Sequence, residues 1–200
     1  MKKIQNLIIV LLFTINCQSQ EGNVVSRCNS SLDFPYGTYL KDINNQFQYY
    51  IGTWQGVYNN TTIELTIQFF ENRKSENADG TYVYYDELGA NYKVLQGLPD
   101  TAFNPPVLYS SMHITEFMKM PLLFIGCGRN NEAKFAYTDH ERCNIEGDLK
   151  LVRNLSNPNE LQYRFHISPA IIFPTADCPF PNGIVPVPLP STVLTLTKIN

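Results

Sequence analysis

The sequence is poor in charge and lacks the motifs that mark most catalytic sites. Only 16% of its 200 residues are charged, and its 15 Lys and Arg do not outnumber its 18 Asp and Glu, so no basic face for nucleic acid is expected. It contains no Gly-x-Ser-x-Gly, no Gly-rich phosphate loop, no Cys-x-x-Cys and no His pair at ligand spacing. We therefore expect no catalytic residues, no metal, no cofactor and no nucleic-acid partner.

A long amphipathic helix is also absent. Twelve Tyr, twelve Phe and 13 Pro favour strands and turns, and apolar residues alternate at a period of two in stretches such as 63–69 and 161–167. About nine or ten short strands follow from this pattern. The predicted fold is an all-β, antiparallel up-and-down β-barrel of about 8–10 strands, with a two-sheet sandwich as the alternative. A short helical turn is expected within 41–50, a surface loop at 71–80, and separate strands at 81–86 and 90–96.

The N-terminus has the form of an export signal. Lys2 and Lys3 precede an unbroken apolar run from Leu7 to Phe13, which is too short for a permanent membrane span. One interpretation places an acylated N-terminus at Cys17, and the other places cleavage before Gln20. Loss of the two lysines takes the net charge from -3 to -5. We expect a signal peptide at 1–19, a flexible tether at 20–37 and one domain at 38–200, with membrane contact only through a lipid anchor.

Export changes the interpretation of the remaining cysteines. These are Cys28, Cys127, Cys143 and Cys178. In an oxidising compartment, four thiols favour two disulfides. Three pairings are open, and we favour Cys127 with Cys143 and Cys28 with Cys178. Zinc is the competing interpretation, because Asp139 and His140 lie between two of the cysteines.

Other titratable residues are interpreted as surface groups. Asp79, Asp86 and Glu87 are expected to be solvated turn acids, since adjacent strand residues point to opposite faces and cannot form one carboxylate pair. The histidines at positions 113, 140 and 166 are scattered along the chain. A lone histidine beside acidic neighbours is more often an exposed side chain than a general base.

The only tryptophan, Trp54, lies in a short motif that resembles one of a known protein family. Gly52-Thr53-Trp54, placed at the first expected strand, resembles the first-strand motif of lipocalins and the wider calycin group. The final stretch 194–198 is similar to their closing strand, in which a basic residue packs across the Trp. The resemblance implies that Gly52, Trp54 and Lys198 close one end of the barrel, with Arg164 as the second candidate for the basic residue.

Most of 38–200 also resembles an uncharacterised family of exported Gram-negative bacterial proteins. The shared segments are Lys41-Asp42-Ile43-Asn44-Asn45, Gly52-Thr53-Trp54-Gln55-Gly56, Tyr85-Asp86-Glu87-Leu88, Tyr137-Thr138-Asp139 and Cys143. This resemblance implies a location in the cell envelope, in the periplasm or outer membrane, or secretion. It implies no activity.

Two non-catalytic functions remain. Tyr82, Tyr84, Tyr92 and Tyr109 could form an apolar wall with hydroxyl groups inside the barrel, for a small hydrophobic ligand, unless side chains fill the interior. Alternatively, the proline-rich loop 168–190 binds another envelope protein. A loop of this length and apolarity is longer than a connection between strands requires, which favours a binding role.

Overall fold

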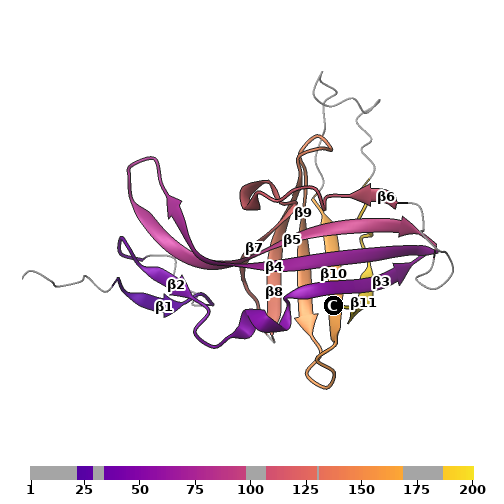
Figure 1. Cartoon of the computed structure of the whole chain (residues 1–200), viewed down its shortest axis with the longest axis horizontal. Helices are drawn as coiled ribbons and strands as arrows, with labels where there is room; N and C mark the ends of the chain where they lie inside the picture. The colour runs from indigo at the N-terminus through magenta and orange to yellow at the C-terminus, as the bar shows by residue number, and fades with distance from the viewer. Residues whose placement is uncertain (1–21, 29–33, 98–106, 130, 169–186) are drawn as a thin grey trace, which may run out of the picture.

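Eight antiparallel strands close into a barrel in the computed structural model, which describes residues 22–28, 34–97, 107–129, 131–168 and 187–200 (Figure 1). The barrel strands are β3 (Gly52–Tyr58), β4 (Thr61–Glu76), β5 (Tyr82–Gln96), β7 (Leu122–Cys127), β8 (Glu132–Asp139), β9 (Ile145–Arg153), β10 (Glu160–Ile167) and β11 (Val193–Lys198). They follow the order β5–β4–β3–β11–β10–β9–β8–β7, and β7 pairs back to β5. The predicted up-and-down barrel is confirmed, and the sandwich is excluded.

Aromatic side chains fill the barrel. Burial alternates along β8 and β9, so each strand turns one face to the core and the other to solvent. The ring of Phe124 lies 4.8 Å from that of Phe47 and 5.9 Å from that of Phe135. A second series joins Tyr92 to Tyr137 at 6.2 Å and Tyr137 to Phe165 at 5.1 Å. The described interior is therefore a packed core of rings, as expected for a barrel of eight strands.

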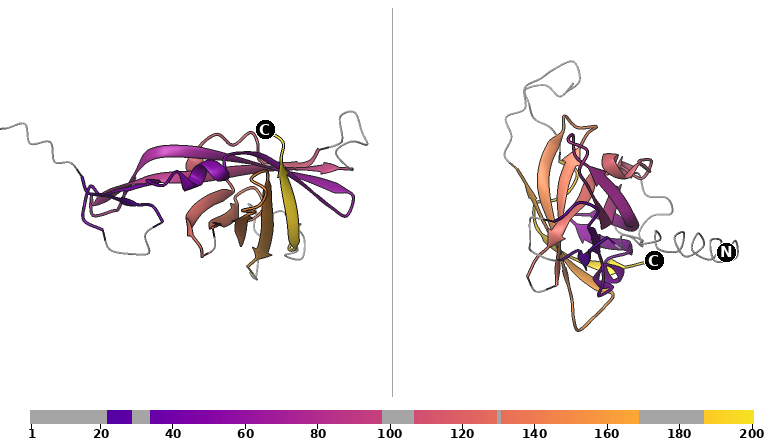
Figure 2. Two further views of the ribbon diagram at one scale, coloured as in Figure 1. Left: turned by 90° about the horizontal axis from the view of Figure 1, so that it is seen from below. Right: turned by 90° about the vertical axis from the view of Figure 1, so that its left-hand side faces the viewer.

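The hairpin of β4 and β5 projects far beyond the barrel, and with β1 (Val24–Ser26) and β2 (Tyr39–Lys41) it forms an extension that we call the arm (Figures 1 and 2). The expected loop at 71–80 is wrong, because β4 continues to Glu76 and the chain turns only at 77–81. A register shift between Phe70 and Arg73 marks the start of the arm.

The expected break between strands at Leu88 and Gly89 is also wrong. β5 runs through both residues without interruption. A side chain at Gly89 would meet the Met120 sulfur and the Phe117 ring, which belong to the segment around η2 (Phe117–Lys119). The glycine therefore permits a close approach of that segment rather than a turn.

The segment expected to be a tether is partly fixed. Within 20–37, β1 pairs in parallel with β2, and β2 pairs in parallel with β5. Val24–Ser26, which lie in the segment expected to be a tether, are thus paired in the sheet. A further short strand, β6 (Val107–Ser110), pairs with the end of β5.

The helical turn expected before the Trp motif is the 3-10 helix η1 (Gln46–Tyr49). Asp42 caps it, because its two carboxylate oxygens accept the backbone N–H groups of Gln46 and Phe47 at 2.8 and 2.9 Å. Phe47 and Tyr50 are buried, whereas Ile43 is exposed. η1 lies across one end of the barrel (Figure 1). Among the described residues, no helix has the length and apolarity that crossing a membrane requires.

Candidate functional site

The end of the barrel at η1 is closed around Trp54. Its side chain is fully buried, and its indole N–H donates to the carbonyl oxygen of Tyr50 at 2.7 Å. Lys198 is its cross-strand partner, and the Lys198 ammonium lies 5.3 Å from the ring centroid, within range of a cation–π interaction. At Gly52, φ is 125° and a Cβ would overlap the Asn200 carbonyl oxygen. Gly52, Trp54 and Lys198 thus lie together where β3 meets the end of β11.

The other candidate for the basic residue is elsewhere. Arg164 is exposed on β10, and its Nε donates to the Gln162 side chain at 2.9 Å. Lys198 is therefore the residue that packs on the Trp54 ring.

A disulfide joins the chain before the barrel to the end of β7. It links Cys28 to Cys127, 99 positions apart. Both favoured pairings are therefore wrong, because the parallel addition of β1 and β2 brings Cys28 beside β7. Cys143 is also disulfide-bonded, and Cys178 lies outside the described residues. Oxidised Cys127 and Cys143 offer no thiolate to a metal, so the zinc interpretation of these cysteines is excluded.

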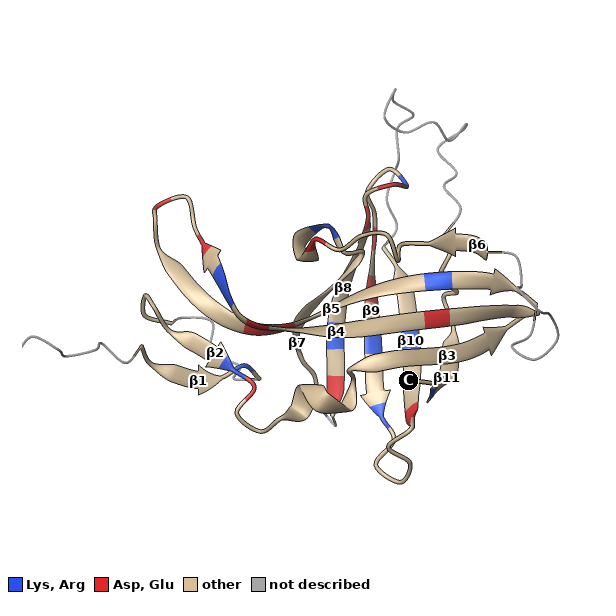
Figure 3. Cartoon of the chain, in the orientation of Figure 1, with Lys and Arg blue, Asp and Glu red and all other residues tan. Residues whose placement is uncertain are grey.

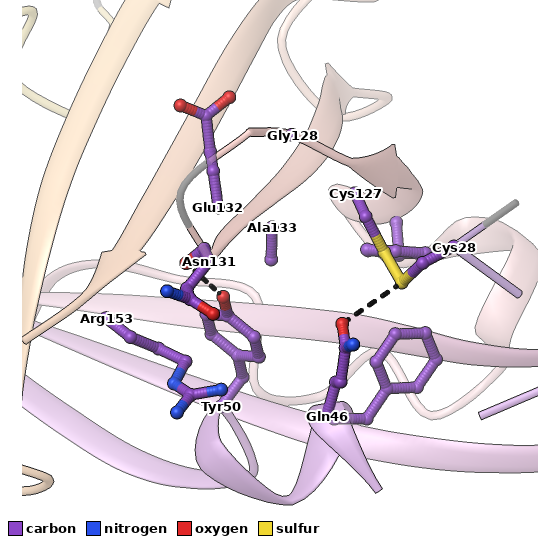
Figure 4. A pocket seen from close by; sticks show the side chains of 11 residues that line it. Cys28, Gln46, Tyr50, Cys127, Gly128, Asn131, Glu132, Ala133 and Arg153 are labelled. Atoms are coloured by element: carbon purple, nitrogen blue, oxygen red, sulfur yellow. Dashed lines mark hydrogen bonds between the residues drawn. A yellow bond between two sulfur atoms is a disulfide. The ribbon is translucent and has the colours of Figure 1, made fainter. Parts of the chain in front are cut away.

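A pocket of about 270 Å³ lies beside this disulfide, between η1 and the hairpin of β7 and β8 (Figure 4). Its apolar side is formed by Phe47, Phe124 and Ala133, which belong to the barrel core. Its polar side is formed by Gln46, Tyr50, Asn131, Glu132 and Arg153. Cys28, Cys127 and Gly128 complete the lining. We call this concavity the disulfide pocket.

Hydrogen bonds and stacking hold the polar side in place. The Tyr50 hydroxyl donates to the Asn131 carbonyl oxygen at 2.6 Å, and burial raises the pKa of this phenol well above its usual value. The Arg153 guanidinium stacks over the Tyr49 ring at 3.2 Å from its centroid. The disulfide sulfur of Cys28 lies 3.5 Å from the Gln46 side-chain oxygen. The pocket thus combines one aromatic wall with one anion and one cation.

The four tyrosines predicted to bind a ligand do not line one cavity. Tyr82 and Tyr84 lie on the arm, with ring centroids 5.6 Å apart. Tyr92 is inside the barrel. Tyr109 lies on β6, where the Arg142 guanidinium is 4.3 Å from its ring centroid. The structure therefore separates two half-buried rings on the arm from two rings at the barrel.

Buried Asp139 organises the barrel around Tyr92. Its carboxylate accepts hydrogen bonds from the hydroxyls of Tyr92 and Tyr137 at 2.8 and 3.1 Å. It also forms an ion pair with Arg142 at 2.8 Å. Burial is the main reason that the pKa values of both phenols lie well above their usual range. These donors satisfy the carboxylate, so its role is to hold strands together.

Two of the histidines lie at a more open concavity of about 640 Å³ beside η2. His113 Nε2 lies 2.8 Å from a Glu141 carboxylate oxygen, and both side chains are more than half exposed. His140 Nδ1 lies 2.9 Å from the Asn144 side-chain oxygen. His166 is exposed on β10. The described residues contain no group of three His, Cys, Asp or Glu that could hold a metal ion.

Sequence patterns did not single out most of the disulfide pocket. Nothing in the sequence spacing of the polar lining residues indicates that they meet. They come from η1 (Gln46), the residue before β8 (Asn131), β8 (Glu132) and β9 (Arg153). The one available signal was the apolar spacing of the helical turn, which includes Phe47. Most of the proline-rich loop, 169–186, lies outside the described residues. Its last residues are fixed, since the Tyr163 hydroxyl donates to the Pro190 carbonyl oxygen at 3.2 Å.

In Figure 3, Lys and Arg are interspersed with Asp and Glu along the described strands of the barrel and the arm. The fold and its site define a closed, lipocalin-like eight-stranded barrel with a packed interior and a small pocket at its Trp-closed end. Residues 1–198 match a family described as "Family of unknown function (DUF6705)", and the chain belongs to that family. No curated protein and no solved structure matches it significantly.

Proposed function

We propose that this protein is an exported, non-catalytic binding protein of the cell envelope that holds a small, largely apolar molecule with a polar end in the disulfide pocket. The observation that carries the proposal is the pocket's two-sided lining. Phe47 and Phe124 offer apolar area, while Glu132 and Arg153 offer charges for a polar end. Placed polar groups that converge beside an aromatic wall can fix the orientation of a small molecule.

The volume limits the ligand. About 270 Å³ corresponds to roughly nine water molecules at about 30 Å³ each. A single aromatic ring or a short aliphatic chain with a carboxylate, amine or hydroxyl fits this space, and a whole lipid does not. The packed barrel interior also supports a small ligand. Aromatic rings fill the core, so a ligand can contact core residues such as Phe47 and Phe124 at the barrel end.

Two features support export. The apolar run from Leu7 to Phe13 after two lysines has the form of a signal peptide, and disulfides persist mainly in oxidising compartments. Cell fractionation and mass spectrometry of the mature protein test this. We expect envelope or secreted material that begins at acylated Cys17 or at Gln20. A cytoplasmic chain that retains Met1 would contradict export.

Ligand binding is tested by filling the pocket. Ala133 is buried on the inner face of β8 and lines the pocket, whereas Ala136 lies on the outer face of the same strand. Purified protein is exposed to a small-molecule extract of cell envelopes, and retained species are detected by native mass spectrometry. We expect wild type and Ala136→Leu to retain a small molecule that Ala133→Leu loses.

The two leucine variants are first compared by circular dichroism, so that a folding defect is recognised. Arg153→Gln provides a second route, because it removes the cation without adding volume; we expect it to weaken retention of a ligand with an anionic end. If nothing is retained by wild type, or if Ala133→Leu retains the same species, the pocket is not a ligand site.

A further inference from the structure

A second concavity, of about 770 Å³, lies on the arm and not at the barrel. Two tyrosine rings, two asparagines and two glycines dominate its lining: Tyr39, Tyr84, Asn23, Asn72, Gly22 and Gly37. Val24 is the remaining described residue. None of these side chains carries a charge. We call this concavity the arm groove.

The two rings lie together because of the register of the arm. Tyr39 on β2 is the direct partner of Tyr84 on β5, and directly paired residues project from the same face of a sheet. Tyr82, two residues before Tyr84, extends this face with its ring in edge contact at 5.6 Å. Gly22 and Gly37 allow two backbone segments to approach closely beside the rings, because a Cβ at Gly22 would lie 2.5 Å from the Gly37 carbonyl oxygen.

A buried carboxylate beneath the groove fixes two of its lining residues. Asp86 is only 2% exposed, which corrects its interpretation as a solvated acid. Its Oδ1 accepts the Tyr39 hydroxyl at 2.5 Å and the Asn72 backbone N–H at 3.1 Å. Its Oδ2 accepts the Asp42 backbone N–H at 2.8 Å. Asn72 is thereby held at φ 53° in the bulge of β4 with its side chain exposed.

We propose that the arm groove is a binding site for neutral saccharides. The C–H face of a pyranose carries a partial positive charge that the negative face of an aromatic ring attracts. An asparagine amide offers two donors and one acceptor, which suits vicinal hydroxyl groups. The lining itself is uncharged, which favours a neutral ligand. The Lys41 and Lys74 ammonium groups lie over the Tyr39 and Tyr82 rings, 5.7 and 4.6 Å from their centroids, so we assign the sugar contact to Tyr84. Asp86 prepares the site, because it fixes the Tyr39 ring and the Asn72 backbone before a ligand binds.

The proposal is independent of the disulfide pocket, and its test uses different variants. Full-length mature protein is titrated with neutral di- and trisaccharides of glucose and of N-acetylglucosamine. Soluble neutral polysaccharides with the same units form a second arm. Saturation-transfer NMR detects contact, and line broadening gives the affinity. We expect binding to wild type, and a roughly tenfold loss in Tyr84→Ala, the amount that one aromatic contact accounts for.

Tyr84→Phe keeps the ring and should retain affinity within about threefold, because stacking and not the hydroxyl makes the contact. Asn72→Gly, which removes the exposed amide but tolerates the φ of 53°, should weaken binding without affecting the fold. Tyr58→Ala, an exposed tyrosine at the far end of β3, is the matched control and should bind as wild type does. Absence of binding at millimolar saccharide overturns the proposal, as does equal binding by Tyr84→Ala or a response to anionic sugars alone.

Discussion

Truncation of Trp54 tests whether the barrel is closed as described. Trp54→Ala removes a fully buried indole, and the usual cost of such a truncation is about 3–5 kcal/mol of unfolding free energy. Part of this cost comes from the Tyr50 carbonyl oxygen, which loses its donor at 2.7 Å and would be left unsatisfied. A smaller part comes from the Lys198 ammonium over the ring.

A conservative variant separates these contributions. Trp54→Phe keeps a buried ring but removes the N–H group, so we expect a loss of about 1–3 kcal/mol. Tyr58→Ala, an exposed aromatic residue on the same strand, should cost less than about 1 kcal/mol. The series from control to Phe to Ala therefore predicts three distinct stabilities.

Guanidinium chloride unfolding, followed by circular dichroism, measures these differences at constant m-value. In thermal unfolding, the loss in Trp54→Ala corresponds to roughly 6–20 °C for a domain of this size. If Trp54→Ala loses less than about 1 kcal/mol, the indole does not close the barrel. If Trp54→Phe and Trp54→Ala are equally destabilised, the ring contributes nothing beyond its N–H group.

Two further predictions concern the disulfide and the alkaline limit of stability. The Cys28→Ser/Cys127→Ser double variant should lose about 2–5 kcal/mol of unfolding free energy, because the disulfide closes a loop between residues 99 positions apart. Urea unfolding under non-reducing conditions measures this loss, and an unchanged midpoint would contradict it. Burial raises the pKa of Tyr163 well above its usual value of about 10. The buried neutral phenol therefore contributes fully to stability below pH about 10, and this contribution is lost as the pH rises further. Tyr163→Phe should therefore lose stability less steeply than wild type above that pH, and parallel curves would refute the assignment.

Strand period and the Trp motif predicted the barrel because both are local properties. Alternation along 63–69 and 161–167 requires only the side-chain period of a strand, and β4 and β10 follow it. The arm could not be predicted in this way. Its bulge depends on Asn72 donating to Asp86, 14 positions away, and the strand at Gly89 depends on the segment around η2.

The disulfide pocket was beyond sequence patterns for a related reason. Its lining combines η1 with the ends of β7, β8 and β9, and these segments meet only after the barrel has closed. Sequence proximity suggested a bond between Cys127 and Cys143, whereas the observed bond joins residues 99 positions apart. The tyrosine prediction failed to group its residues because β5 extends beyond the barrel, so that Tyr84 and Tyr92 belong to different parts of the molecule.

Three acidic residues in the segments that carry the family resemblance turn out to join parts of the fold. Asp42 caps η1, Asp86 joins β2 to the bulge of β4, and Asp139 joins β5 to β8 and Arg142. Their lone pairs are engaged by hydroxyl and N–H donors, which leaves them little capacity for proton transfer to a substrate. The segments shared with the family therefore contain residues that hold the fold together. Arg153 in the disulfide pocket and Asn72 in the arm groove lie outside those segments, so the two binding sites that we propose depend on residues that the resemblance does not include.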